Sequence, residues 1–332
     1  MGLSPTDLPG IEPASPPPSP EVWQWPERSP MQSARPEPIW RYVVLFVLTI
    51  ASTTQAGALH YASFIVGFSN RVPDLPLASF LLHGLWYSVS ILAILGCHEL
   101  GHYYACRYYG VDASRPYFLP MPLLLTGTLG AFIRIRSPIS SKRALFDIGV
   151  AGPIAGFLVT VPLLFVGMQM STVIRVPEQF AGQVFELGEP LLFKAASWLT
   201  FGPVQDGYTV NMHPVAFAAW FGMLATALNL FPIGQLDGGH IAYAVLGRRS
   251  TMVTLFTVLC LIGLSFVSTS WIVWTVLTVA MLLTFGPRHP RTPDEDRPLD
   301  TTRILVAGFA LVIFIVCFTP APIEPSALMG RP

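Results

Sequence analysis

The chain has 332 residues, of which 52% are hydrophobic and only 11% are charged. Soluble domains carry roughly 25% charged residues, so this composition argues against a water-soluble protein and favours one that lies mostly within a membrane. The formal net charge of zero argues against nucleic acid or an acidic protein as the main partner. The four cysteines lie in or beside apolar runs, which predicts buried thiols rather than a disulfide framework.

The N-terminal 38 residues differ in composition from the rest of the chain. They are rich in Pro, Ser and Glu and include three consecutive prolines, Pro16 to Pro18. Since they lack apolar periodicity, residues 1–38 are expected to form a disordered cytosolic tail. Neither the apolar core of a signal peptide nor the composition of a transit peptide is visible here. A bacterial cytoplasmic (inner) membrane is therefore the expected location, with a plastid membrane as the alternative.

Seven apolar segments follow the tail, and each approaches the ~20 residues that a helix needs to cross a bilayer. They cover residues 42–67, 79–108, 144–168, 213–231, 251–268, 271–286 and 304–320. The fifth and sixth segments flank Ser268-Thr269-Ser270 and form either a tight hairpin or one bent element. The sequence therefore predicts an all-α polytopic membrane protein with six or seven transmembrane helices.

The basic residues are unevenly distributed between the two ends of these segments. With seven alternating spans and a cytosolic N-terminus, fifteen of the nineteen Lys and Arg fall on the cytosolic side. An excess of basic residues on one side marks the cytosolic face of a membrane protein. The distribution therefore predicts a multi-pass protein whose N-terminus is cytosolic.

The second apolar segment contains the sequence His-Glu-Leu-Gly-His at residues 98–102. Histidines four residues apart share one face of a helix, about 6 Å apart along its axis, so His98 and His102 can bind a single Zn²⁺. Glu99 is then placed to take a proton from a water molecule that the metal activates. Arg107 is the first charge beyond this motif, which puts the metal roughly 8–14 Å inside the cytosolic boundary. The pattern predicts a hydrolytic metal site within the bilayer.

The helical pattern is interrupted over residues 112–140. Prolines at positions 116, 120 and 122 cannot continue a helix, and the sequence alternates from Phe132 onward as an extended strand does. The third apolar segment follows and includes the small-residue stretch 151–156, for which close helix packing is a sufficient explanation.

A catalytic zinc ion needs a third protein ligand, and ionisable groups are costly enough in lipid to leave few candidates. Asp237 is the favoured candidate. It lies where the fourth apolar segment meets Pro232 and Gly234, unwinds, and restarts after Gly238 and Gly239. A broken helix at membrane depth is tolerated where it lines a cavity.

Three other residues are alternatives to Asp237. Cys106 shares the face of the two histidines but lies one turn too far along the helix for its sulfur to reach the metal easily. Asp147 is close to Lys142 and Arg143, so packing or pairing near the membrane interface explains it better than metal ligation. His240 either supports a ligand or is simply a residue at a helix N-terminus.

The two motifs together resemble the signatures of the site-2 protease family of intramembrane zinc metalloproteases. These signatures are HExxH on one transmembrane helix and N-x-x-P-x-x-x-x-D-G on another. Asn229, Pro232, Asp237 and Gly238 match the second signature at each fixed position. The resemblance covers roughly residues 80–250.

The resemblance implies one Zn²⁺ per chain, bound by His98, His102 and Asp237. It also implies that Glu99 acts as general base and acid, and that Asn229 helps to hold the substrate or the developing oxyanion. The implied reaction is hydrolysis of a peptide bond in or near the transmembrane segment of a membrane-anchored protein. Such a substrate is often a single-span regulator that a site-1-type protease has already cut on the other side of the membrane.

The resemblance further implies that residues 112–140 form a membrane-dipping hairpin or edge strand close to the metal. Gly130 and Phe132 are then the expected substrate contacts, because an unpaired strand edge can accept an unwound peptide as an added strand. An amphipathic surface hairpin with no role in substrate binding is the alternative.

These observations divide the chain into four parts. They are the tail (1–38), a first transmembrane helix and loop (39–77), the catalytic core (78–250) and the C-terminal helices and tail (251–332). Within the core, the non-cytosolic loop 169–212 has no Gly-Leu-Gly-Phe-like sequence and is short for a separate domain, so no PDZ domain is expected. The charged run at 292–300 is expected to be a solvated cytosolic linker.

Two other classes of function stay open. A transporter can use buried His, Glu and Asp side chains to relay ions or protons, although this does not explain the ligand spacing of the histidines. An inactive relative that binds membrane helices without cutting them is the second class, and the intact Glu99 argues against it. A rival family of HExxH membrane proteases takes a Glu from a later helix as third ligand, and no later apolar segment here supplies one.

Overall fold

The computed structural model describes residues 37–69, 75–122, 125–177, 185–286 and 291–325. The chain divides into two units, residues 1–38 and residues 39–332. The predicted Pro-rich tail lies outside the described residues except for its last two, so the fold below is that of the second unit.

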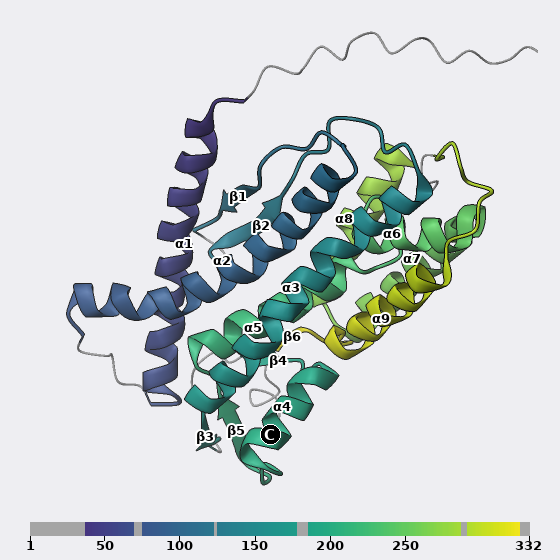
Figure 1. The fold of residues 1–332 in the computed structure, drawn as a ribbon. Helices are drawn as coiled ribbons and strands as arrows, with labels where there is room; N and C mark the ends of the chain where they lie inside the picture. Colours follow the sequence, from purple (N-terminus) through teal and green to yellow (C-terminus); the bar gives the residue numbers. More distant parts are fainter. Residues whose placement is uncertain (1–36, 70–74, 123–124, 178–184, 287–290, 326–332) are drawn as a thin grey trace, which may run out of the picture. The chain divides into compact units, whose positions relative to one another are not determined.

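This unit is built mostly from helices, as the sequence predicts (Figure 1). The helices are α1 (Ile39–Val66), α2 (Leu77–Tyr108), α3 (Lys142–Met170), α4 (Leu191–Phe201), α5 (Pro214–Asn229), α6 (Asp237–Leu246), α7 (Ser250–Val267), α8 (Ser270–Phe285) and α9 (Thr301–Cys317). A single 3-10 turn, η1 (Gly247–Arg249), joins α6 to α7.

The strands are short and pair in three antiparallel sheets of two strands each. These pairs are β1 (Tyr117–Pro120) with β2 (Thr128–Phe132), β3 (Thr172–Arg175) with β5 (Tyr208–Asn211), and β4 (Phe185–Leu187) with β6 (Ile323–Pro325). Each strand therefore has one edge that no other described strand pairs with.

Four helical stretches are long and apolar enough to cross a membrane. They are α1, α2, α3 and the continuous stretch Asp237–Val267, which comprises α6, η1 and α7. The helices α4, α5, α8 and α9 are apolar but shorter. This pattern is that of a polytopic membrane protein.

Helices α1 and α2 run antiparallel, and small residues let their backbones approach closely. A Cβ atom built on Gly84 would lie 2.2 Å from the carbonyl oxygen of Thr54, and one on Gly57 would lie 2.3 Å from the carbonyl oxygen of Gly84. The hydroxyls of Thr53 and Ser88 share a buried hydrogen bond of 2.7 Å between the same two helices. Close backbone contact and interhelical hydrogen bonds are the interactions that hold helices together in lipid.

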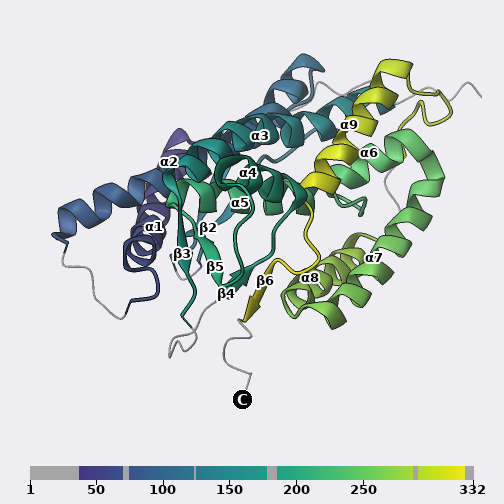
Figure 2. The ribbon, with the colours of Figure 1, turned by 90° about the horizontal axis from the view of Figure 1, so that it is seen from below.

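Helices α2 and α3 lie side by side, and α5 packs against both (Figures 1 and 2). Their shared core includes fully buried Tyr87 and Ile91 of α2, Phe146 of α3, and Trp220 and Met223 of α5. Side chains of α9 belong to the same core. The C-terminal helix therefore packs as part of the bundle that carries the site.

The sequence located the strand after the second helix imprecisely. Instead of running from Phe132 onward, β2 ends there and pairs with β1, with Leu119 opposite Gly130. Beyond Phe132 the chain makes only one isolated bridge among the described residues, between Ala113 and Ile135. The sequence alternation there does not correspond to a regular ladder: Arg134 is exposed, and Arg136 is partly covered beside Asp112. The rings of Tyr42 and Tyr117, 4.4 Å apart between centroids, stack β1 on α1.

Residues 169–212 contain more secondary structure than a loop. The described part holds β3, β5 and helix α4, which buries Phe193 and Ala196. Residues 185–187 pair with the C-terminal residues 323–325, a contact that the sequence does not suggest. The apolar content of this region explains why helix α4 forms there, because its two buried side chains face the bundle core.

The α8–α9 linker (residues 291–300) is docked on α3 rather than simply solvated. The backbone N–H of Lys142 donates to Asp294 at 2.7 Å, and its ammonium group donates to the carbonyl oxygens of Glu295 and Arg297 at 3.0 and 2.9 Å. Lys142 is only 7% exposed. The linker thus compensates a buried charge and an unpaired amide at the start of α3.

The α1–α2 contact yields a stability prediction. Replacing Gly84 with Ala forces the two backbones apart, and overpacking of this kind costs about 1–3 kcal/mol. Gly263→Ala in α7 is the matched control, because a Cβ atom there meets nothing within 4 Å. Thermal unfolding of the detergent-solubilised protein should show a lower Tm for Gly84→Ala and an unchanged or higher Tm for Gly263→Ala. Equal Tm values for the two variants would contradict this account of the packing.

Candidate metal centre

Helix α2 presents both histidines of the HExxH motif to the interior of the bundle. The Nε2 atoms of His98 and His102 lie 3.1 Å apart, and the two side chains are 6% and 7% exposed as residues. The helix is unbroken across the motif, so the four-residue spacing brings both rings to one face. The two imidazoles are therefore held together by the regular geometry of one helix.

Asp237 reaches the same place through the break between α5 and α6. Helix α5 ends at Asn229, and Gly234 adopts a positive φ of 46° in the turn that follows. Helix α6 begins at Asp237 itself and not after the two glycines as expected from the sequence. Gly238 is needed for a different reason, because a Cβ atom there would lie 2.1 Å from the carbonyl oxygen of Leu230. The glycine lets the broken segment fold back tightly on α6.

The three side chains form a compact triangle. Asp237 Oδ2 lies 3.3 Å from His98 Nε2 and 3.2 Å from His102 Nε2. Within the part of the chain that the structure describes, these residues are the only group of three His, Cys, Asp or Glu with ligand atoms all within 4.8 Å of one another. The favoured third candidate from the sequence is thus the one that the fold brings to the histidines.

The alternative ligands lie elsewhere. Cys106 is fully buried in a separate apolar cluster with Val111 and Ile148. Asp147 pairs with Arg303 of α9 and not with its sequence neighbours Lys142 and Arg143: the Arg303 Nε donates to its carboxylate at 2.9 Å. His240 lies one turn along α6 from Asp237 and is not part of the triangle.

The Asp147 ion pair joins three elements near one end of the bundle. The hydroxyl of Tyr109, just after α2, donates to the Asp147 carboxylate, and Arg303 also donates to this hydroxyl at 3.2 Å. Burial and the hydrogen bond to Asp147 raise the pKa of the Tyr109 phenol above its usual range. The interaction accounts for Asp147 as a structural residue that links α3 to α9.

Helix α3 fixes the orientation of the histidine rings. The Nδ1–H of His102 donates to the carbonyl oxygen of Ile148 at 2.7 Å, so in the neutral imidazole Nε2 carries no proton and faces the triangle. A Cβ atom on Gly152 would lie 2.1 Å from His102 Nε2, and one on Gly156 would lie 3.2 Å from His98 Cβ. The small-residue stretch of α3 therefore makes room for the two histidine side chains as well as for helix packing. The sequence of this stretch indicates only the second role.

The donor set and its dimensions fit a metal ion. Two imidazole nitrogens and one carboxylate oxygen are ligands of a borderline metal such as zinc. Tetrahedral ligands at ~2.1 Å from zinc lie roughly 3.4 Å from one another. The three edges of the triangle, 3.1, 3.3 and 3.2 Å, are close to that spacing. A metal also offsets the cost of burying the Asp237 carboxylate, whose side chain is 16% exposed.

Glu99 lies beside the triangle without belonging to it. Its Oε1 atom is 4.0 Å from His98 Nε2, and the residue is 7% exposed. The backbone N–H of Ile133, the residue after β2, lies close enough to the Glu99 carboxylate to interact with it electrostatically. The hairpin therefore reaches the centre, and it does so through a backbone group that no side-chain pattern in the sequence reveals.

The three predicted substrate contacts are placed differently. The Asn229 Nδ2 atom lies 3.3 Å from His98 Nε2, so its amide is at the centre. Gly130 and Phe132 lie in β2, three and one residues before Ile133, at the edge of the centre. Phe132 is 43% exposed and stacks on Tyr117, and the space around Gly130 is open.

Two imidazoles and a carboxylate on apolar helices, with a glutamate beside them, define a membrane-embedded metal-binding protein of the HExxH type. Residues 86–269 match the model of Peptidase family M50, and the chain belongs to that family. The match confirms the resemblance to the site-2 protease family that the two motifs indicate.

Several curated proteins are similar to the chain. The probable zinc metalloprotease EGY1, chloroplastic, of Arabidopsis thaliana is 28% identical over 317 residues, which cover 88% of this chain and 56% of that protein. The probable zinc metalloprotease EGY2, chloroplastic, of Oryza sativa subsp. indica is 30% identical over 255 residues, 75% of this chain and 45% of that protein. The chain thus spans about half the length of the curated relatives it matches. No solved structure gave a significant match.

The contact between α3 and the histidines yields a test of the centre. Gly152→Ala places a methyl group on the His102 ring, so we expect the ring to move and the metal content of the purified protein to fall at least about tenfold. Gly96→Ala in α2 is the control, because its Cβ atom meets only the Phe118 ring at 3.6 Å, an ordinary contact. Inductively coupled plasma mass spectrometry measures both. Full metal content in Gly152→Ala would show that α3 does not shape the centre.

Proposed function

We propose that the protein is an intramembrane zinc metalloprotease, which hydrolyses a peptide bond in or near the transmembrane segment of a membrane-anchored protein. The observation that carries the proposal is the buried triangle of His98, His102 and Asp237 with Glu99 at its side. These residues lie on helices apolar enough to cross a membrane. Family membership and the printed names of the relatives, probable zinc metalloproteases, support the same reading.

The two histidines and Asp237 would hold one zinc ion per chain. Bound zinc supplies Lewis acidity, which lowers the pKa of water toward ~7 and polarises a carbonyl group. The remaining chemistry belongs to the side chains of the protein.

Glu99 is the group that moves the proton. Its carboxylate takes a proton from the attacking water and later gives one to the leaving amine, a role that requires a position next to the ligands. The Ile133 N–H lies close to this carboxylate. The amide of Asn229 is a neutral donor on the His98 side, suited to the oxygen on which negative charge develops.

The β1–β2 hairpin is the proposed binding site for the unwound substrate. A helix must unravel before its peptide bond reaches a protease, and a strand edge stabilises the extended form by backbone hydrogen bonds. The open space at Gly130 and the exposed ring of Phe132 are suited to a chain added along β2. In this arrangement the hairpin dips into the membrane beside the centre.

The proposed topology has six or seven spans with a cytosolic N-terminus. The four long helical stretches form part of it, and α5, α8 and α9 are the shorter candidates. The excess of Lys and Arg on one side supports the orientation. A bacterial inner membrane is the proposed location. The plant relatives are chloroplastic by name, which makes a plastid membrane the alternative.

The proposed catalytic core covers residues 78–250, without an inserted PDZ domain. The proposed substrate is a single-span regulator, released by this cut after a site-1-type protease has trimmed its other side. Neither a nucleic acid nor a further cofactor enters the proposal.

Two variants separate the roles of the ligand and the base. Glu99→Gln should keep about one zinc ion per chain but lose proteolysis of a tagged transmembrane substrate by roughly 10²-fold or more, because general-base catalysis contributes 10²–10⁴-fold. Asp237→Ala should lose most of its zinc and its proteolysis. Metal analysis and a gel-based cleavage assay measure the two properties.

Asp112→Ala is the control, since this aspartate is exposed and outside the centre. It should behave as the wild type in both assays. Retention of zinc by Asp237→Ala would remove Asp237 from the ligand set. Ion transport that survives in Glu99→Gln, without proteolysis in the wild type, would favour the ion-relay class instead.

A further inference from the structure

The turn of the β1–β2 hairpin is fixed inside the bundle, away from the metal centre. The phenol hydroxyl of Tyr87 on α2 donates to the carbonyl oxygen of Thr126 at 3.0 Å, and Tyr87 is fully buried. Gly127 packs on the backbone of α1, because a Cβ atom there would lie 2.6 Å from the carbonyl oxygen of Ser52. The turn is therefore held between α1 and α2. The proposed reaction makes no direct use of either contact.

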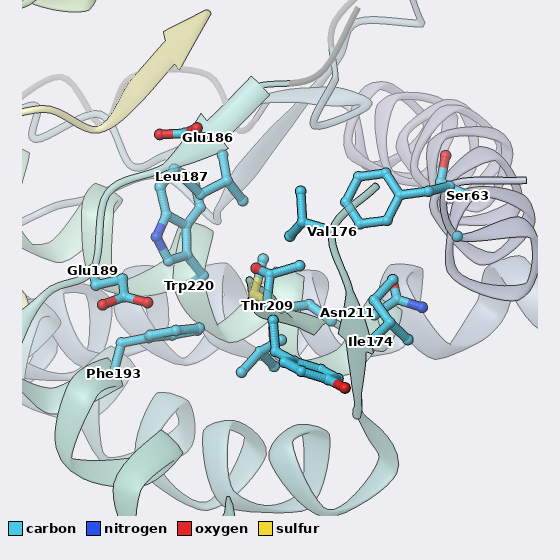
Figure 3. Close-up of a pocket in the computed structure, with 15 residues that line it drawn as sticks. Ser63, Ile174, Val176, Glu186, Leu187, Glu189, Phe193, Thr209, Asn211 and Trp220 are labelled. Atoms are coloured by element: carbon cyan, nitrogen blue, oxygen red, sulfur yellow. The ribbon is translucent and has the colours of Figure 1, made fainter. Parts of the chain in front are cut away.

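A second contact to this turn comes from α1 and is less protected. The Nε2–H of His60 donates to the carbonyl oxygen of Leu125 at 2.8 Å, and Leu125 is 52% exposed. One turn further along α1, Ser63 lines an open pocket of about 540 Å³ (Figure 3). Solvent competes for a hydrogen bond at an open surface, whereas a buried donor that loses its partner pays the full cost of desolvation. The contact with Tyr87 is therefore the firmer of the two.

The other end of β2 lies at the metal centre, beside the same helix. The N–H of Ile133, one residue after β2, is close to the carboxylate of Glu99 on α2. On the helix, Tyr87 and Glu99 are twelve positions apart, a rise of ~18 Å. On the strand side, Thr126 and Ile133 are seven positions apart, a length of up to ~23 Å. The two lengths are similar, so β2 runs beside α2 in the same direction, and α2 contacts the hairpin near both ends of the strand.

Hydrogen bonds inside the hairpin connect the turn to β2. The Thr126 hydroxyl donates to the carbonyl oxygen of Thr128 at 2.6 Å. The Thr128 hydroxyl donates to the carbonyl oxygen of Leu119 at 2.7 Å and accepts from the Gly130 N–H at 3.0 Å. The turn and the first half of β2 thus form one connected unit. A shift of Thr126 along α2 therefore shifts the strand with it.

The position of β2 along α2 decides which bond of an added strand reaches the metal centre. In the proposed function the unwound substrate pairs with the edge of β2, and backbone hydrogen bonds fix its register on that strand. The histidines and Glu99 stay on α2 while the paired substrate follows β2. One residue of a strand is ~3.3 Å long, so a displacement of β2 by that length brings a neighbouring peptide bond to the metal centre.

We infer that Tyr87 is a positioning residue that sets the cleavage position within the substrate, because its hydroxyl fixes how far β2 extends along α2 toward the metal centre. The inference rests on the proposed function and adds a determinant of specificity to it. Tyr87 acts through the hairpin and not on the reacting groups. Helix α2 thus carries both the two histidines and the residue that sets the distance between them and the substrate-binding strand.

Tyr87→Phe tests the inference, because it removes the hydroxyl and keeps the aromatic ring in the core. The purified full-length proteins are incubated with a tagged transmembrane substrate, and mass spectrometry of the products gives the cleavage positions. The wild type should cut mainly at one bond. Tyr87→Phe should place about half of its cuts or more at neighbouring bonds, because the register of β2 is then less strongly fixed. Its zinc content should equal that of the wild type.

Ser88→Ala is the matched control. It removes the buried 2.7 Å hydrogen bond between Ser88 and Thr53, which joins α2 to α1 one residue away from Tyr87. Loss of a buried hydrogen bond should lower the Tm of both variants. The cleavage position should change only in Tyr87→Phe, so a purely structural role for the Tyr87 hydroxyl does not give the same result.

Hydrogen–deuterium exchange of the same proteins tests the anchor without proteolysis. The backbone amides of residues 125–133 should exchange about fivefold faster in Tyr87→Phe than in the wild type, and at the wild-type rate in Ser88→Ala. Unchanged exchange in Tyr87→Phe, or cleavage by this variant at the wild-type bond alone, would overturn the inference and leave the proposed protease activity intact. A wild type that does not cut would overturn the proposed function, and the role of Tyr87 in cleavage with it.

Discussion

The burial of a carboxylate between two imidazoles inside an apolar bundle is the constraint on which the rest of the structure depends. Asp237 and the two histidines have little exposed surface, and an uncompensated charge in such a place costs several kcal/mol. Their mutual distances allow a bound cation to offset that cost. The neighbouring helices must then hold three side chains from two separate parts of the sequence within about 3 Å of one another.

Small residues meet this demand. The glycines of α3 at positions 152 and 156 bring its backbone against the two rings, and the Ile148 carbonyl sets the proton position on His102. In the segment that carries Asp237, the turn after α5 is compact only because Gly238 has no Cβ atom to clash with the Leu230 carbonyl. A single added methyl group would clash at Gly152 and Gly238 and would crowd His98 at Gly156. Packing and chemistry are therefore specified by the same positions.

The sequence predicts much of this centre but not all of it. The histidine spacing is a property of any helix, and a proline with glycines around an aspartate marks a break, so these features are visible without a structure. The helical segments are likewise visible as apolar runs. Backbone groups are a different case. Every residue has a carbonyl group and nearly every residue has an N–H, so no residue type signals the roles of the Ile148 carbonyl and the Ile133 N–H. Pairings between distant elements, such as Asp147 with Arg303 or β4 with β6, are hidden because the sequence does not show which separated segments meet.

The position of Lys142 has a consequence for how the molecule can be divided. Its ammonium group is surrounded by carbonyl oxygens from residues 295 and 297, and the backbone N–H of Thr292 donates to the Tyr243 hydroxyl on α6, 3.2 Å away. The same α8–α9 linker thus touches both the helix behind the histidines and the helix that begins with Asp237. A fragment ending near residue 250 would retain His98, His102 and Asp237 but lose the groups that surround the Lys142 ammonium at the start of α3. The contacts that complete the fold around α3 and α6 therefore extend beyond the residues that form the centre.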